Sequence, residues 1–181
     1  MAENLAMKYK HIVSLIAFLF LYSSCSDSNQ KVDTAELFRI ANGKPIFISL
    51  LANRGEYVCC ELAEPKLGEG VLIANRETKG GWETFELVDL KNGNIALKAA
   101  NNKFVCADAM NRDLLCANRD LAGDWETFNV VSLPEGKVAL KTLSGKYVSV
   151  AYDLTDTLAR RLIANRTEIG DWEKFAIEIG D

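Results

Sequence analysis

Short apolar stretches separated by polar turn residues run through the chain from about residue 45 to its end. In the middle of this region the apolar stretches cover Ile95–Lys98, Phe104–Ala107, Leu114–Asn118 and Glu126–Val131. They are rich in β-branched, aromatic and leucine residues, with Gly, Asn, Asp and Lys between them. This is the pattern of strands and turns rather than of helices. The sequence therefore predicts an all-β domain over residues 45–181.

The same sequence unit occurs three times in this domain. An Ala-Asn-Arg tripeptide recurs, and a Trp-Glu-x-Phe phrase follows it at a constant distance. The tripeptides are Ala74-Asn75-Arg76, Ala117-Asn118-Arg119 and Ala164-Asn165-Arg166, and the tryptophans that follow them are Trp82, Trp125 and Trp172. The spacing is 43 and then 47 residues, so the third unit carries extra residues around Tyr152–Arg160. The three units span about residues 46–88, 94–131 and 137–179.

Three units of four strands predict a β-trefoil with pseudo-threefold symmetry. In this fold six strands close a small barrel and six form hairpins that cap one end. Closure removes the exposed edges that an open sheet of the same size would present. A propeller needs at least four blades, and a sandwich does not predict a threefold repeat.

Residues that recur in all three units are expected to serve the fold, because a single binding site would need only one copy. We predict that the repeated aromatic side chains form the core: Trp82, Phe85, Trp125, Phe128, Trp172 and Phe175. The alternative for the tryptophans is a sugar-stacking platform. We also predict three ion pairs, namely Arg76 with Glu83, Arg119 with Glu126 and Arg166 with Glu173.

The N-terminus has the order of a secretory signal. Lys8 and Lys10 precede the apolar run Ile12–Tyr22, and Ser23, Ser24 and Cys25 follow it. The run is too short to span a bilayer, which needs roughly 20 apolar residues. We predict a signal peptide over residues 1–24, with Met7 as a plausible start.

Residues 21–25 resemble the lipobox of bacterial lipoproteins, although Tyr22 stands where that motif prefers Leu. The resemblance implies acylation of Cys25, a tether over residues 25–44, and a protein anchored in the cell envelope, on the outer membrane or facing the periplasm. Plain secretion is the alternative. Within the tether, Glu36–Ile40 echoes the Glu-x-Phe strand and is either an extra strand or a chance match.

Composition narrows the function. The chain has 181 residues, is 49% hydrophobic and carries a formal net charge of −4, which fits one domain and gives no reason to expect a nucleic-acid partner. The single histidine, His11, lies in the predicted signal, so a histidine-based catalytic triad is excluded from the mature chain. No Gly-x-Ser-x-Gly or glycine-rich phosphate motif occurs. We expect a protein that is not an enzyme and has no cofactor.

The cysteines of the domain are expected to be buried. Cys59 and Cys106 align with Ser149 between units, whereas Cys116 aligns with isoleucines. Cys106 and Cys116 lie on adjacent predicted strands, so an oxidising compartment could join them. No spacing typical of a metal site occurs, and the polar loop at Asp108–Asp113 lacks the pattern of an EF-hand.

The repeated phrases, together with Gly145-Lys146-Tyr147-Val148, make residues 46–179 similar to the fascin-like trefoil family. That family includes actin-bundling proteins with several trefoils and single trefoils that resemble carbohydrate-active proteins. The resemblance implies a non-catalytic binding module for a carbohydrate or glycan. The alternatives are a protein-interaction or scaffolding domain that binds an envelope or host protein, and fascin-type binding of actin filaments.

Ligand binding is expected where the units differ. Outside the signal and the repeats, one aromatic residue stands beside several polar ones, in the longer loop of the third unit. The predicted ligand-binding residues are Tyr152, Asp153, Asp156 and Arg160. The alternative is an ordinary solvated loop. We expect a monomer whose only contact with a membrane is the N-terminal lipid.

Overall fold

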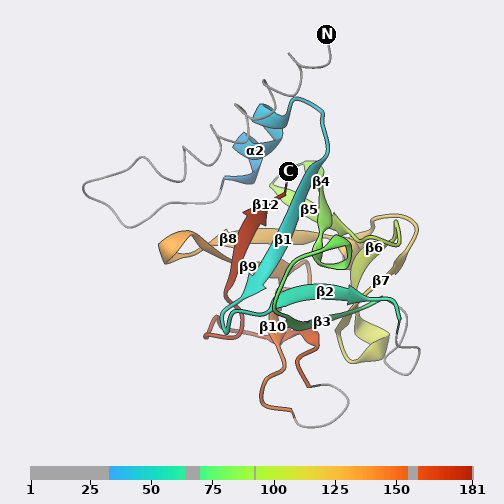
Figure 1. The fold of residues 1–181 in the computed structure, drawn as a ribbon, viewed down its shortest axis with the longest axis vertical. Coiled ribbons are helices and arrows are strands. Elements are labelled where there is room, and N and C mark those ends of the chain that lie inside the picture. The colour runs from blue at the N-terminus through green and yellow to red at the C-terminus, as the bar shows by residue number, and fades with distance from the viewer. Residues whose placement is uncertain (1–32, 64–69, 92, 155–158, 181) are drawn as a thin grey trace.

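The computed structural model describes residues 33–63, 70–91, 93–154 and 159–180, and shows a strand-rich domain with one short α-helix (Figure 1). The helix is α2 (Thr34–Ala41). The strands are β1 (Ile46–Ala52), β2 (Tyr57–Glu61), β3 (Val71–Arg76), β4 (Phe85–Lys91), β5 (Asn94–Lys98), β6 (Phe104–Asp108), β7 (Leu114–Arg119), β8 (Phe128–Ser132), β9 (Lys137–Thr142), β10 (Tyr147–Val150), β11 (Leu162–Arg166) and β12 (Phe175–Ile179). Short 3₁₀ turns are η2 (Gly81–Glu83), η3 (Ala109–Asn111), η4 (Asp124–Glu126) and η5 (Pro134–Gly136).

Six strands pair around a closed ring. β1 pairs with β4, β4 with β5, β5 with β8, β8 with β9, β9 with β12, and β12 returns to β1, all antiparallel. The return to β1 means that none of these six strands is left with a free edge along its whole length. The domain is therefore all-β with a closed sheet, as the sequence predicts.

The remaining strands form three hairpins, β2–β3, β6–β7 and β10–β11. The hairpins meet one another through β3 with β7, β7 with β11, and an isolated bridge between Ile73 and Arg161. Each hairpin begins after a turn with one positive φ, at Gly55, Asn102 or Gly145. Glycine and asparagine tolerate this left-handed conformation, which explains why the turns recur at the same place.

The repeated phenylalanines form the centre of the core. Phe85, Phe128 and Phe175 open β4, β8 and β12 and are fully buried. They belong to one apolar cluster that also contains residues of the other three ring strands, including Ile48 on β1, Leu97 on β5 and Leu140 on β9. The prediction that these three rings are core is confirmed. The fourth strand of the middle unit begins at Phe128, not at Glu126 as expected, because Glu126 lies in the 3₁₀ turn η4.

Helix α2 lies against the end of the ring where the turn between β4 and β5 is found (Figure 1). Asp33 caps its start by accepting hydrogen bonds from the backbone N–H of Ala35 and Glu36, and Asn42 ends it in the left-handed conformation. Leu37 is buried in the main core, and Phe38 and Ala41 pack beside it. This spacing is that of one helical face.

Of the two alternatives for Glu36–Ile40, the extra strand is wrong, because a helix covers these residues. The expected tether over residues 25–44 is in part a folded helix that packs on the domain. The predicted signal at residues 1–24 and the proposed acylation site Cys25 lie outside the described residues. Among the residues that the structure describes, no helix is long and apolar enough to cross a membrane.

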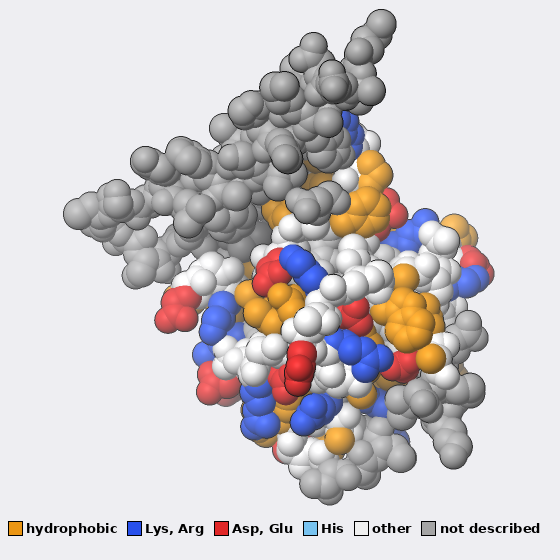
Figure 2. Space-filling view, viewed as in Figure 1, with side chains coloured by type: hydrophobic (Ala, Val, Ile, Leu, Met, Phe, Trp, Pro, Cys, Tyr) orange, Lys and Arg blue, Asp and Glu red, His pale blue; other side chains and the backbone are white. Residues whose placement is uncertain are grey.

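Charged side chains of both signs are mixed over the face drawn in Figure 2, with single hydrophobic groups between them. This face shows no large region of one charge. It therefore offers no electrostatic reason to expect a nucleic acid there, in line with the formal net charge of −4.

Arg161 is a buried cation among apolar residues. It stands three residues before Ala164, and Val71 and Leu114 occupy the same position in the other units. The residue is 6% exposed, and its Nε has no hydrogen-bond partner. No ion pair joins Arg161 to a carboxylate of the described residues, and a buried charge without such a partner is destabilising because the solvation it loses is not replaced.

We expect Arg161→Leu to raise the free energy of unfolding in urea by about 1–3 kcal/mol, since Leu removes the buried charge and is the residue of the second unit. Arg39→Leu removes an exposed cation and serves as the control, with a change within about 0.5 kcal/mol. A destabilised Arg161→Leu protein would contradict the prediction.

The four cysteines that the structure describes are buried and form no disulfide with one another: Cys59, Cys60, Cys106 and Cys116. Cys106 and Cys116 lie directly opposite each other on β6 and β7 and are not bonded. Burial raises the pKa of the Cys59 and Cys116 thiols to about 11 and also raises that of Cys106. Since the thiolate is the reactive form, these thiols are protonated and unreactive at neutral pH.

In a Cys25→Ser variant, we expect a disulfide reagent such as DTNB to leave the cysteines unmodified at pH 8, because the thiols are buried and their pKa is raised. In urea all four should react. Rapid reaction in the folded protein, or two thiols missing after unfolding without reductant, would contradict the free, buried arrangement.

Candidate functional site

Each unit contains a turn built on a buried glutamate. Glu83, Glu126 and Glu173 are between 4% and 6% exposed. Their Oε2 atoms accept hydrogen bonds from the backbone N–H of Gly80, Gly123 and Gly170, at 2.8, 2.8 and 2.6 Å. The carboxylate therefore closes the turn that leads into the next ring strand.

The three predicted Arg–Glu ion pairs are present. The Nε-to-Oε1 distances are 3.6 Å for Arg76–Glu83, 3.8 Å for Arg119–Glu126 and 3.8 Å for Arg166–Glu173. Each arginine also pairs with a second carboxylate, of Glu61, Asp108 or Asp153 respectively. The arginine thus ties the end of a hairpin to the turn before the following ring strand.

The repeated tryptophans lie at the surface, so the prediction that they are core is wrong. Trp82 is 37% exposed and Trp125 is 41% exposed, whereas Trp172 is half-buried. The adjacent glutamate turns inward to the glycine N–H, and the indole takes the outer side of the same turn. Repetition identified these residues as important without showing which side of the turn they occupy. The alternative of a sugar-stacking platform is the one that fits their exposure.

Arginine packs against two of the indoles. The guanidinium of Arg119 lies 6.0 Å from the centroid of Trp125, and that of Arg166 lies 5.6 Å from Trp172. At this range a cation is attracted to the ring face. The same arginines that hold the glutamates therefore also orient the tryptophans.

Tyr152, the predicted centre of the ligand site, is engaged within the protein. Its hydroxyl donates to Glu56 Oε2 at 2.8 Å, and Arg54 lies 4.2 Å from its ring centroid. Its ring meets Trp172 edge-on, with centroids 6.3 Å apart. The pKa of Tyr152 is raised, mainly by burial and to a smaller extent by the hydrogen bond to Glu56. The expectation of a free aromatic face at Tyr152 is wrong, because Arg54 and Trp172 occupy its surroundings.

The other residues of the predicted site are not gathered around Tyr152 as a cluster of free groups. Asp153 pairs with Arg166 at 3.1 Å. Arg160 is exposed in the left-handed conformation, and its backbone bonds Ala74 and Ala151. Asp156 lies outside the described residues. Binding at these residues remains a prediction from the sequence.

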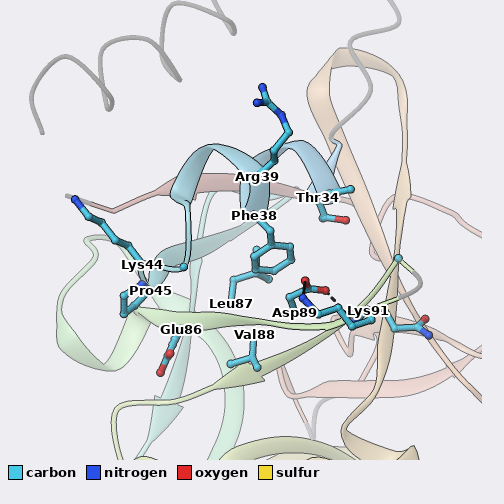
Figure 3. Close-up of a pocket in the computed structure, with 14 residues that line it drawn as sticks. Thr34, Phe38, Arg39, Lys44, Pro45, Glu86, Leu87, Val88, Asp89 and Lys91 are labelled. Carbon is cyan, nitrogen blue, oxygen red and sulfur yellow. Dashed lines mark hydrogen bonds and ion pairs between the residues drawn. The ribbon is translucent and has the colours of Figure 1, made fainter. Parts of the chain in front are cut away.

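A hollow of about 630 Å³ lies between α2 and the β4–β5 hairpin (Figure 3). Phe38 points from the helix toward Leu87 on β4, while Arg39 points away from the hollow. Asp89 and Lys91 at its edge pair with each other at 2.6 Å. Its aromatic ring is packed on the core, and the charges of Asp89 and Lys91 are paired with each other, so it offers no exposed aromatic face for stacking.

A second pocket, of about 320 Å³, is formed around Trp125 and is called here the Trp125 pocket. Its lining residues are Ala107, Ala109, Asp113, Asp124, Trp125, Thr142, Leu143, Ser144 and Ala164. Trp125 and Leu143 are both exposed, at 41% and 54%. An exposed indole thus stands beside two carboxylates and two hydroxyls.

The polar groups of the Trp125 pocket are held in place. The Asp113 backbone N–H donates to Asp108 O at 2.9 Å, and Asp113 O accepts from Ala164 N at 2.8 Å. The hydroxyls of Thr142 and Ser144 lie 2.9 Å apart and share a hydrogen bond. Groups that are already fixed lose little conformational entropy when a ligand binds.

The residues around the corresponding tryptophans differ in the other two units, and these differences can be seen in the sequence. In the third unit, Tyr152 lies against Trp172, and Arg54 lies over the ring of Tyr152. In the first unit, Gly81 stands in place of Asp124 and Ala99 in place of Thr142. The signal in the sequence for the Trp125 pocket is the set of loop residues that differ between units, namely Asp124, Thr142 and Ser144.

A metal site has no support in the described residues, because they contain no group of three or more His, Cys, Asp and Glu side chains placed to hold an ion. The loop at Asp108–Asp113 folds as a strand end and the turn η3, with the Asp108 side chain accepting from Met110 N. One Asp108 carboxylate oxygen is thus committed to capping this turn.

Comparison with known proteins begins with solved structures. The designed 3-fold symmetric protein ThreeFoil is 20% identical, with a TM-score of 0.62, and the match covers 72% of this chain and 96% of that one. The BEL beta-trefoil (11% identity, TM-score 0.60) is covered over 93% of its length by 75% of this chain. SeviL, solved bound to asialo-GM1 saccharide, gives 13% identity and a TM-score of 0.54, with 74% and 95% covered.

These likenesses show a β-trefoil-like fold and nothing more specific. A mosquitocidal holotoxin also matches, with a TM-score of 0.62 and 9% identity, but this chain spans only 18% of that one. No curated protein matches the sequence. One family profile does match, over residues 47–158, which is more than half of the chain. The chain therefore belongs to the family described as "Domain of unknown function (DUF7910)".

Proposed function

We propose that this protein is a non-catalytic module that binds a carbohydrate in the Trp125 pocket. The single observation that carries the proposal is an exposed indole beside two aspartates and two hydroxyl-bearing residues in a pocket of about 320 Å³. A sugar ring has an apolar C–H face and a polar hydroxyl edge. The indole suits the first, and Asp113, Asp124 and Ser144 can accept hydrogen bonds from the second.

The neighbours support this proposal at the level of the fold. SeviL, with a similar fold, was solved with a bound saccharide. The pocket volume falls at the lower end of the usual range for small-molecule sites, roughly 300–1,000 Å³. That size fits one or two sugar units at the end of a glycan better than a long buried chain.

Within this fold we propose three four-stranded repeats related by a pseudo-threefold axis, of the fascin-like kind. The threefold recurrence of the Arg–Glu pairs and of the buried phenylalanines supports it. The absence of catalysis is part of the proposal. It rests on the sequence, in which the one histidine is His11 and the motifs for nucleophilic or phosphate chemistry are missing.

We further propose that the protein is held in the bacterial cell envelope by acylation of Cys25. Helix α2, which lies within the expected tether, is at the β4–β5 end of the ring (Figure 1). The Trp125 pocket lies at the hairpin end, because Thr142–Ser144 leads from β9 into β10 and Trp125 from β7 into β8. An anchor at Cys25 thus leaves the pocket facing away from the membrane.

The anchor is tested by mass spectrometry of the protein isolated from bacterial membranes. We expect an N-terminus at Cys25 that carries two or three acyl chains, since one chain alone gives only marginal attachment. The Cys25→Ser variant should be released from the membrane. An unmodified Cys25 in the mature protein would overturn the anchor and leave the binding proposal untouched.

Carbohydrate binding is tested on a glycan array that includes the asialo-GM1 saccharide and β-glucan oligosaccharides, followed by titration of the strongest hit. We expect Trp125→Ala to weaken binding about tenfold or more, because the stacking face is lost. Trp82→Ala removes the corresponding, similarly exposed indole outside the pocket and should change affinity less than about twofold.

Tyr152→Ala, measured beside these variants, tests the site that the sequence predicted. A loss confined to Tyr152→Ala would move the site to the third unit. Equal losses for Trp82→Ala and Trp125→Ala, or an array with no bound glycan, would count against the proposal.

A further inference from the structure

The Trp125 pocket carries negative charge that no ion pair within residues 33–63, 70–91, 93–154 and 159–180 neutralises. Its nine lining residues include Asp113 and Asp124 and no Lys, Arg or His. In the part of the chain that the structure describes, neither aspartate forms an ion pair. Arg119, which lies over Trp125, is itself held between Glu126 and Asp108. A ligand in the pocket therefore meets two carboxylates that no described residue pairs with.

The third unit contains a cation that the middle unit lacks. Asp171 stands at the position of Asp124, and it pairs with Lys174 at 2.9 Å. In the middle unit the residue three places on is Thr127, whose hydroxyl donates to Gly123 O at 2.7 Å instead. The turn that supplies a cation in the third unit therefore leaves Asp124 without one. Directly after β7, Asp120 is paired with Lys103.

We propose that the Trp125 pocket selects a sugar that carries a free, protonated amino group, of the glucosamine type, over its N-acetylated or acidic counterparts. This rests on the proposed function, since it names the class of sugar for the same pocket. The indole packs on the ring, and the ammonium group donates to Asp113 and Asp124. A charge-assisted hydrogen bond is stronger than a neutral one, and a carboxylate on the sugar would be repelled.

The test compares three disaccharides by calorimetric titration at pH 6 and low salt: one of glucosamine, its N-acetylated form, and one containing glucuronic acid. We expect the glucosamine form to bind about tenfold more tightly than the N-acetylated form, and the acidic form more weakly than both. The preference should shrink in 0.5 M NaCl, because salt screens charges near the surface.

Variants separate this inference from the proposed function. Asp124→Asn and Asp113→Asn should each reduce the preference for the amine by about threefold or more while the N-acetylated sugar still binds. Asp171→Asn removes the same charge outside the pocket and is the matched control, with the preference unchanged. Trp125→Ala should weaken all forms alike.

Equal binding of the amine and its N-acetylated form, lost in Trp125→Ala, would overturn the amine selectivity and leave carbohydrate binding in place. A preference for the amine that Asp171→Asn reduces as much as Asp124→Asn would show attraction to the whole protein and would also overturn it. Binding that EDTA abolishes would replace the amine by a metal ion as the partner of the aspartates, with the same consequence.

Discussion

The rest of the domain depends on one interaction, the binding of a buried glutamate carboxylate in the turn that carries each repeated tryptophan. This carboxylate is almost removed from water, yet it is satisfied by a glycine N–H and by an arginine. The turn is thereby fixed, so the phenylalanine two residues later enters the core and the tryptophan one residue earlier faces outward. Three such turns link the hairpins to the ring strands and set where β4, β8 and β12 begin.

This arrangement places the residues shared by the three units on the inward side of each unit and the residues that vary on its outward side. The inward side of every unit is occupied by the same aromatic ring and the same ion pair, so substitutions there would disturb packing throughout the core. The outward side presents an indole on a rigid support, next to loops that differ between units. A binding site built by loop changes on a fixed scaffold is a common solution in β-rich domains.

The loops give the three indoles different surroundings. In the third unit, Tyr152 packs against Trp172 and Arg54 lies over Tyr152, and the hydrogen bond from Tyr152 to Glu56 joins the last unit to the first. In the middle unit, the same region holds Asp124, Thr142 and Ser144 and stays open. One aromatic position thus serves as interior packing between units in one place and as a candidate ligand platform in another.

The sequence by itself determined the all-β class, the threefold pattern and the identity of the structural pairs, because periodicity and equal spacing are local properties that a chain carries without being folded. It located Phe128 in the core and Arg119 beside Glu126 for that reason. It could not tell that Trp125 faces water, that Leu37 lies in a helix packed on the ring, or that Arg54 reaches Tyr152 across nearly 100 residues. Those outcomes depend on which side of a turn is filled by groups distant in the chain, and only the closed tertiary structure brings such groups together.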